Sequence, residues 1–320
     1  MTSGSRAVAL WALIVVNVIW GFHVAFTALA VQDMSPFAFN AIRTGVALSI
    51  LLPLGLRAGL WPVVRRGWPG LLLSGIMGFT ISQTAFAFSL KLAPGAIIAI
   101  LSALGPLTLA FMSILFLGER MARAGWMGMA LATTGALLIL GLSPAELGGE
   151  GISTLLGGII FLGGIISWYA FNVVAKRLLV REEPMAMAAG ATLFGWVGLL
   201  IAFGIHTAAS GEAIQWSSQA IFGILFTGIL GNAFGFLALH WALKRLEGSR
   251  VGALSYIQPV LGVVGAWTFL GEQPGPSFLL GALLILAGVY LVTTAHIRIV
   301  SPPQRPAAAP RPELKPESPT

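Results

Sequence analysis

The sequence has no cysteine and very few charged residues. Only 9% of its 320 residues are Asp, Glu, Lys or Arg, whereas a soluble domain has roughly 25%. Without cysteine the chain has no disulfide, no thiolate nucleophile and no cysteine-ligated metal. The scarcity of charge, with 57% hydrophobic residues and a mean hydropathy of +0.90, indicates a membrane protein.

The sequence also lacks the motifs of the rival functional classes. It has no HExxH, GxSG, GxGD or DxxxD motif, and no Asp or Glu in the middle of an apolar stretch, which argues against an intramembrane enzyme. The segment "LLSGIMG" lacks the Lys of a phosphate-binding loop, so direct use of ATP is excluded. The net charge of +7 is not gathered in a basic run, so we expect no nucleic-acid partner. We expect no metal and no cofactor.

Ten apolar stretches are close to the roughly 20 residues that cross a bilayer. Turn-forming residues, such as "APG" and "GEQPGP", separate them. The sequence therefore predicts an all-α membrane protein with ten transmembrane helices, at about 8–30, 37–56, 70–91, 95–117, 123–142, 153–175, 185–207, 218–241, 250–270 and 277–295.

The cations lie on alternate connections between these stretches. One side carries nearly all of them, and the other has one cation, Lys91, among five acidic residues. The positive-inside rule places the cationic side, and both termini, in the cytoplasm. We expect residues 1–7 to be a cytoplasmic N-terminus and the Pro-rich residues 296–320 to be a disordered cytoplasmic tail. The cationic side comprises Arg6, Arg57, Arg65, Arg66, Arg120, Arg123, Lys176, Arg177, Arg181, Lys244, Arg245, Arg250 and the cations of the tail.

A repeat divides the chain into two halves. The phrase "LFLGER" at residues 115–120 returns as "TFLGEQ" at 268–273, and the same shift carries Gly75 onto Gly228 and Pro106 onto Pro259. Each half, 8–142 and 153–295, holds five helices, with an external linker at 143–152. Because five is odd, the second copy enters the membrane from the opposite side. Two inverted five-helix repeats are typical of secondary transporters with alternating access, although a duplicated packing unit would give the same pattern.

Several segments resemble the EamA-type branch of the drug/metabolite transporter superfamily. They are "WGFHVAF", "NAIRTGVAL", "GPLTLAFMSILFLGERMARAGWMGMALATTGALLIL" and the second copy "LKRLEGSRVGALSYIQPVLGVVGAWTFLGEQPGPSFLLGALLILAGVYLV". The resemblance covers nearly all of residues 8–295. It implies ten helices, cytoplasmic termini and the export or exchange of small metabolites such as amino acids. It also implies a central cavity formed by helices 1–4 and 6–9, with helices 5 and 10 at the periphery.

The repeated Gly-Glu pairs follow the last apolar turn of helices 4 and 9. We expect Gly118 and Gly271 to turn the chain, and the following Glu to lie beside the N-terminus of the next helix. A gating role for the carboxylate is the alternative. Pro106 and Pro259 lie inside helices 4 and 9, where proline kinks a helix. They are candidate hinges, and static kinks are the other interpretation.

Polar residues inside apolar stretches are the candidate substrate-binding residues, because polar side chains in hydrocarbon usually face the bundle interior. Hydrogen bonding between two helices is the structural alternative for each one. Arg43 is the most informative, since no carboxylate lies at its depth. Its partner is then a helix-end carbonyl, water or an anionic group of the cargo, unless its side chain extends to the external surface. The candidates are Asn17, Trp20, His23, Asn40, Arg43, Gln83, Trp168, Asn172, Asn232, Tyr256 and Gln258.

Helices 5 and 10 carry small residues at four-residue spacing, as in Ala124, Gly128 and Ala132, a pattern typical of helix packing. This stripe could serve a homodimer. The sequence thus indicates a plasma (bacterial inner) membrane transporter of a small molecule, such as an amino acid. A lipid flippase or a channel-like facilitator is the alternative. Proton coupling through His23 or His240 and facilitated exchange are both open.

Overall fold

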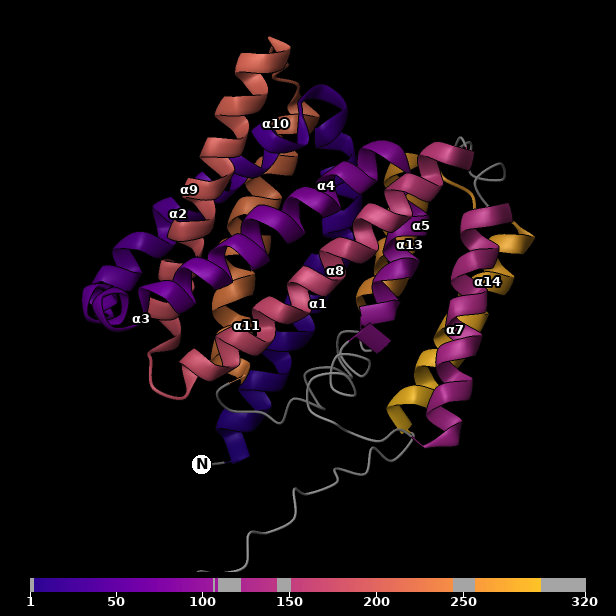
Figure 1. The fold of residues 1–320 in the computed structure, drawn as a ribbon, viewed down its shortest axis with the longest axis horizontal. Coiled ribbons are helices and arrows are strands. Elements are labelled where there is room, and N and C mark those ends of the chain that lie inside the picture. The colour runs from indigo at the N-terminus through magenta and orange to yellow at the C-terminus, as the bar shows by residue number, and fades with distance from the viewer. Residues whose placement is uncertain (1–2, 106, 109–121, 143–150, 244–256, 295–320) are drawn as a thin grey trace, which may run out of the picture.

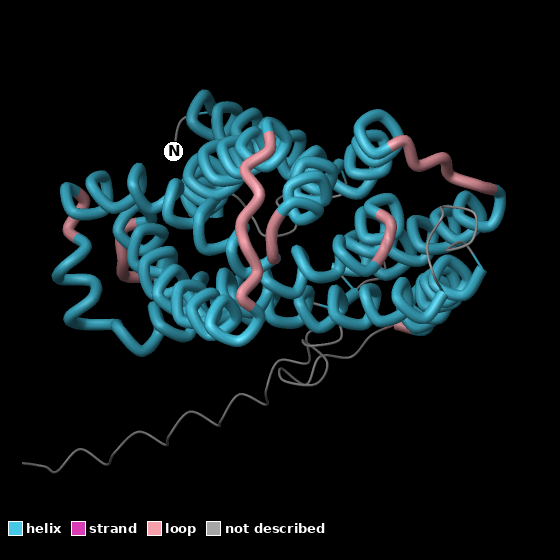
Figure 2. The backbone as a smooth tube through the Cα atoms, turned by 90° about the horizontal axis from the view of Figure 1, so that it is seen from above, coloured by secondary structure: helices cyan, strands magenta, loops and turns pink. Residues whose placement is uncertain are grey.

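The computed structural model describes residues 3–105, 107–108, 122–142, 151–243 and 257–294, and every regular element in this part of the chain is a helix (Figure 1). Short loops join most neighbouring helices (Figure 2). In chain order the elements are α1 (Ser3–Asp33), α2 (Pro36–Arg57), α3 (Leu60–Gly75), η1 (Ile76–Ile81), α4 (Ser82–Leu92), α5 (Gly95–Leu101), η2 (Ser102–Leu104), α7 (Arg123–Leu142), α8 (Gly151–Leu179), α9 (Pro184–Ser210), α10 (Ser218–Leu225), η3 (Phe226–Phe234), α11 (Gly235–Leu243), α13 (Ile257–Leu270) and α14 (Pro276–Thr294).

Seven helical stretches of the described chain are long and apolar enough to cross a membrane, and three shorter apolar helices lie at 95–104, 257–270 and 276–292. The chain is therefore a multi-pass membrane protein. One predicted boundary was wrong: the third stretch, expected at 70–91, is continuously helical from Leu60 to Leu92. The reason is a kink. Gly67 has a non-helical φ of −136° and Pro69 follows it. These two residues, which are typical of a helix boundary, mark a bend within the helix instead.

Helices from the two ends of the chain pack against each other. Helix α1 packs mainly against α13, α2 against α9, α4 against α8 and α5 against α13. Figure 1 shows this pairing, with indigo and purple helices beside pink and orange ones. The first 142 residues therefore do not form a separate body, and the interior of the molecule is built by both halves.

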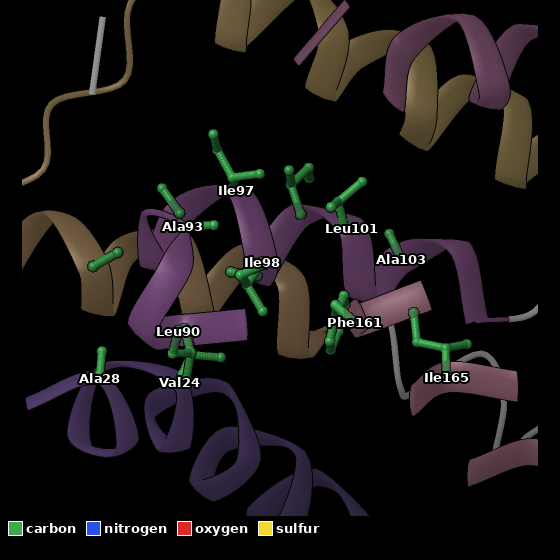
Figure 3. Packing of buried hydrophobic residues seen from close by; sticks show 14 of the residues in the cluster. Val24, Ala28, Leu90, Ala93, Ile97, Ile98, Leu101, Ala103, Phe161 and Ile165 are labelled. Carbon is green, nitrogen blue, oxygen red and sulfur yellow. The ribbon is translucent and has the colours of Figure 1, made fainter. Parts of the chain in front are cut away.

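The largest apolar cluster surrounds α5, all of whose seven residues are buried. Ile97, Ile98 and Leu101 of this helix lie among side chains of α1, α4 and α8, including Val24, Leu90 and Phe161 (Figure 3). Since neighbouring helices cover α5 on every side, its position is fixed by packing. A change at its N-terminus is therefore felt by several helices.

Helices α7 and α14 form a pair at one edge of the molecule (Figure 1) and pack mainly on each other. Their backbones meet at glycines: a Cβ added to Gly288 would lie 2.4 Å from the Gly128 carbonyl oxygen, and one added to Gly135 would lie 2.5 Å from that of Gly281. The small residues Gly128 and Ala132 thus face α14 of the same chain. A homodimer would have to use other faces of these two helices.

The second Gly-Glu pair joins two distant helix ends. Gly271 has a φ of +71°, as expected of a turn glycine. The Glu272 carboxylate accepts hydrogen bonds from the backbone N–H groups of Gly95 and Ala96, both at 2.7 Å. The prediction that this Glu lies at the N-terminus of the next helix was wrong, because it caps α5, not α14. Burial raises the pKa of Glu272, and these hydrogen bonds act in the opposite direction. Glu119 lies outside the described residues.

Ion pairs occur at the helix ends. Arg66 of α3 lies 2.8 Å from Glu182 in the loop after α8. Glu212, in the loop after α9, accepts a hydrogen bond from His206 at 3.0 Å and lies 3.7 Å from Lys91. The hydrogen bond from His206 is the main cause of the lowered pKa of Glu212. These exposed pairs contribute little stability, but they offer control positions far from the helix interior.

Candidate functional site

Three of the predicted residues meet around the guanidinium of a fourth, Arg43, whose side chain has no exposed surface. They come from α1, α2 and the helix that contains α4. Arg43 donates to the Asn40 side-chain oxygen at 2.8 Å, to the Gln83 side-chain oxygen at 2.6 Å and to Nε2 of His23 at 2.6 Å. We call Arg43, Asn40, Gln83 and His23 the arginine cluster. Arg43 therefore does not extend to the surface, the alternative that the sequence left open.

The local helix geometry explains the arrangement. Asn40 and Arg43 are three residues apart, so both lie on one face of α2. The Asn40 side-chain amide also donates to the Gln83 backbone carbonyl at 3.1 Å, which fixes the Asn40 side chain that Arg43 contacts. Arg43 lies about 10 Å along α2 from Pro36, where the helix begins. The guanidinium also lies 4.9 Å from the centre of the Phe39 ring, a cation–π contact.

The hydrogen bonds fix the proton position on His23. Arginine can only donate, so Nε2 of His23 must accept. In the neutral ring Nδ1 then carries the proton, and it lies 3.3 Å from the Thr27 hydroxyl one turn further along α1. His23 is therefore held neutral, with its one free lone pair directed at Arg43.

A second polar contact joins α1 to α13. The Gln258 side-chain amide donates to the Asn17 side-chain oxygen at 2.6 Å, and the Asn17 amide donates to the Leu13 backbone carbonyl at 2.7 Å. Asn17 is buried and Gln258 is partly buried. These two residues thus bond to each other, not to the arginine cluster.

Aromatic side chains form another group of contacts between α1, α8, η1 and α11. The Trp20 and Trp168 rings meet edge to face at 6.1 Å, and both contact Phe236, at 6.0 and 5.5 Å. Phe79 stacks on Phe236 at 4.6 Å. We call Trp20, Trp168, Phe79, Phe171 and Phe236 the aromatic cluster. Sequence reasoning identified both Trp residues and missed the three Phe residues, since an apolar residue in an apolar helix gives no signal.

The remaining candidates lie outside both the arginine cluster and the aromatic cluster. Asn172 donates to the backbone carbonyl of Trp168 in its own helix, at 2.8 Å. Asn232 is buried, and its side-chain amide nitrogen has no hydrogen-bond partner within the described part of the chain. Pro259 is buried near the start of the described part of α13. Tyr256 and Pro106 lie outside the described residues.

Two π-helical segments interrupt the long helices α3–α4 and α10–α11, a feature that the sequence analysis missed. The shift that carries Gly75 onto Gly228 also carries η1 onto the second part of η3. A π-helical turn leaves carbonyl groups displaced from the regular ladder, and side chains from other helices use them. Trp20 donates to the Gly231 carbonyl at 2.9 Å, and Ser167 donates to the Met77 carbonyl at 2.8 Å. In the sequence, the glycines shared by both halves were the only feature that marked the position of these π-helical segments.

A comparison with known proteins assigns the family. A model described as "EamA-like transporter family" matches residues 7–141 and again residues 155–294. The chain belongs to the EamA-like transporter family. This confirms the resemblance found in the sequence. Among relatives, an uncharacterized transporter, YvbV, of Bacillus subtilis is 28% identical over 290 residues, covering 91% of this chain and 92% of its own.

Two further EamA relatives carry more informative names. A probable terminal-alkyne amino-acid exporter of Streptantibioticus cattleyicolor is 29% identical and covers 93% of this chain and 98% of its own. A probable amino-acid metabolite efflux pump of Salmonella typhimurium is also 29% identical, with coverage of 90% and 95%. A solved crystal structure with 22% identity superposes with a TM-score of 0.63 over 90% of this chain and 97% of its own, which supports the fold. Names of this kind point to transport and away from catalysis.

The two matched segments of this EamA protein differ at the arginine cluster. The shift of Gly75 onto Gly228 carries Arg43 onto Trp196, Gln83 onto Phe236 and Asn40 onto Leu193. Trp196 Nε1 donates to the Ala41 backbone carbonyl at 2.9 Å. At this shift the counterparts of Arg43, Asn40 and Gln83 in the second segment are apolar or aromatic.

Proposed function

We propose that this chain is a secondary transporter of the plasma (bacterial inner) membrane that exports a small metabolite, an amino acid or a similar compound. In this proposal two inverted repeats of five helices alternate between states open to either side. The EamA family and the names of relatives that are amino-acid exporters and efflux pumps support the class of cargo.

The buried charge of Arg43 is the observation that carries the proposal. Each of its three hydrogen bonds goes to a neutral side chain, so the cluster satisfies donors without balancing the charge. An uncompensated charge in a membrane interior costs several kcal/mol. A carboxylate on the cargo would supply the missing negative charge and would accept two parallel N–H groups from arginine. The cluster then stands where the cargo carboxylate binds.

The ten-helix arrangement is part of the same proposal. Seven spans and three shorter apolar helices of the described chain, together with the two matches to one family model, support it. The distribution of cations along the sequence supports cytoplasmic termini. The packing of each early helix against a late one fits the expectation that the transport path runs between the repeats.

The other candidates take supporting roles in this proposal. Asn40 and Gln83 orient Arg43, and the Asn17–Gln258 hydrogen bond holds α1 against α13. Trp20 and Trp168 form the apolar wall, and Asn232 and Asn172 are polar groups near it. Because Arg43 has no exposed surface here, cargo reaches it only after α1, α2 and α4 separate. A homodimer, if formed, uses the outward faces of α7 and α14.

The test uses purified protein in liposomes loaded with a labelled equimolar mixture of the twenty amino acids. The wild type should release part of the mixture, Arg43→Lys should release it more slowly because lysine lacks the bidentate fork, and Arg43→Ala should release almost none. Arg66→Ala, a surface arginine, is the matched control and should behave as the wild type. If Arg43→Ala still transports normally, the site assignment is wrong. Scrambling of labelled lipid by the wild type without amino-acid release would indicate a flippase.

A further inference from the structure

The hydrogen bond between Arg43 and His23 joins one donor to one acceptor inside the apolar part of the molecule. The donor is an Arg43 N–H group and the acceptor is Nε2 of His23, 2.6 Å away. A ligand that replaces this bond without leaving a buried group unpaired must offer both an acceptor, for Arg43, and a donor, for His23. A carboxylate alone satisfies Arg43 and leaves the His23 lone pair unused.

The zwitterionic end of an amino acid offers that combination. Its carboxylate accepts from arginine, and its ammonium group donates to an imidazole nitrogen. We propose that His23 is the residue that binds the ammonium group of the cargo, and that a proton on the same nitrogen competes with the cargo. This inference rests on the proposed function, since it places the cargo carboxylate on Arg43, and it adds the proton-for-cargo exchange.

The competition follows from the single lone pair. Protonation of Nε2 turns it from an acceptor into a donor. It can then bind neither the Arg43 N–H nor the ammonium group. The proton comes from water, the hydrogen bond to Arg43 breaks, and no other covalent bond changes. The empty transporter holds either the Arg43–His23 bond or a proton, and the loaded transporter holds neither.

The surroundings of His23 leave Arg43 as its one charged neighbour within the described part of the chain. The elements packed against α1 are α2, α4, α5, α10, η3, α11 and α13, and α8 contacts it through Trp168. Their other charged or titratable residues are Arg57, Lys91, Tyr169, Lys176, Arg177 and His240. All of them except Tyr169 lie near helix ends, and the Tyr169 ring packs against Gly105. Arg57 is about 21 Å along α2 from Arg43 and Lys91 is about 12 Å along α4 from Gln83. On the aromatic side, Phe86 lies 5.4 Å from the His23 ring.

The glycine contact of His23 has a counterpart in the repeat. Gly231 packs against His23, with a built Cβ 2.9 Å from the ring, and its repeat partner Gly78 packs against Phe171 at 2.8 Å. The ring packed against the glycine is therefore a titratable imidazole in the first pair and a phenyl group in the second. In this exchange one proton competes with one cargo molecule at His23, and the larger proton activity outside a bacterial cell would drive export.

The experiment measures amino-acid binding as a function of pH. The probes are a labelled equimolar mixture of the twenty amino acids and the mixture of their N-acetyl derivatives, which keep the carboxylate and lose the ammonium group. For the wild type, the affinity for the amino acids should fall by about tenfold for each pH unit below the titration midpoint of His23, because one proton competes with one ligand. The N-acetyl mixture should bind more weakly and should not show this fall.

Two variants separate the possible failures. His23→Gln keeps an oxygen that accepts from Arg43 and from ammonium but cannot take a proton, so binding should persist without the pH dependence. His206→Gln, at an exposed helix end, is the matched control and should keep the wild-type dependence. Amino-acid binding with the same pH dependence in wild type and His23→Gln would overturn this inference and leave the proposed function intact. Equal binding of both mixtures would also overturn it. No binding of either mixture by the wild type would overturn the proposed function itself, and this inference with it.

Discussion

Removal of the Glu272 carboxylate tests how the two ends of the chain are held together. In the variant Glu272→Ala, the Gly95 and Ala96 N–H groups lose their acceptor, and residue 94, which precedes α5, is a proline with no side-chain oxygen to replace it. Hydrogen bonds to a charged group contribute about 1.5–3 kcal/mol each. The burial that raises the pKa of Glu272 opposes them. We therefore expect a net loss of about 2 kcal/mol, at the upper end of the range for a lost helix cap.

The assay is thermal unfolding of purified protein in detergent. A loss of about 2 kcal/mol changes the ratio of folded to unfolded protein by roughly thirtyfold, which lowers the midpoint by several degrees. Glu272→Gln retains one acceptor oxygen and should fall between alanine and the wild type. Gln273→Ala changes an exposed neighbour and is the control. Unfolding of Glu272→Ala at the wild-type temperature would refute the view that this carboxylate holds α5.

Four further predictions follow from the same structure. Because burial raises the pKa of Glu272 above its ordinary 4.5, ionisation costs more in the folded than in the unfolded state, so the unfolding midpoint of the wild type should decline as the pH rises from 4.5 through the folded-state pKa, and Glu272→Gln should lack this decline. Gly288→Leu should lose about 1–3 kcal/mol by overpacking against α7, measured by the same unfolding assay, while Gly163→Leu, whose Cβ would meet nothing within 4 Å, should not. If Pro259 is a hinge, Pro259→Ala should slow liposome transport at unchanged substrate affinity, and an unchanged rate would favour a static kink. A periplasmic phosphatase fused after Thr320 should be inactive in cells, since activity would place the C-terminus outside.

The sequence singled out all four residues of the arginine cluster as candidates, but it did not predict all of their contacts. The spacing of Asn40 and Arg43 places them on one helix face whatever the rest of the fold does. The contact between Arg43 and His23 depends on the relative depth and tilt of α1 and α2, which a linear pattern does not contain. Asn17, a candidate on the same helix as His23, bonds to Gln258 of α13 and not to the arginine cluster, and this partner also depends on how the helices pack.

Other features were missed because their sequence signals are shared by several structures. Glu272 carries a charge that suits any helix N-terminus, so the sequence favoured the nearest one along the chain, and the fold brings a helix from the other half. The glycine-rich pattern of α7 fits a partner in the same chain as well as one in a second copy. The π-helical segments have no propensity signature of their own, and only the glycines common to both halves marked their position.

The packing of early helices against late ones has a consequence for biosynthesis. When α7 has left the ribosome, the principal partners of α1, α2, α4 and α7 have not yet been made. At about 5–20 residues per second, the first half waits roughly 8–30 s in the bilayer before α14 is complete. The buried arginine is spared that delay, since His23, Asn40 and Gln83 all precede α5 in the chain. Its polar partners are therefore in place as soon as the first three membrane spans have been inserted, and the membrane-insertion machinery can release these spans with the charge already hydrogen-bonded.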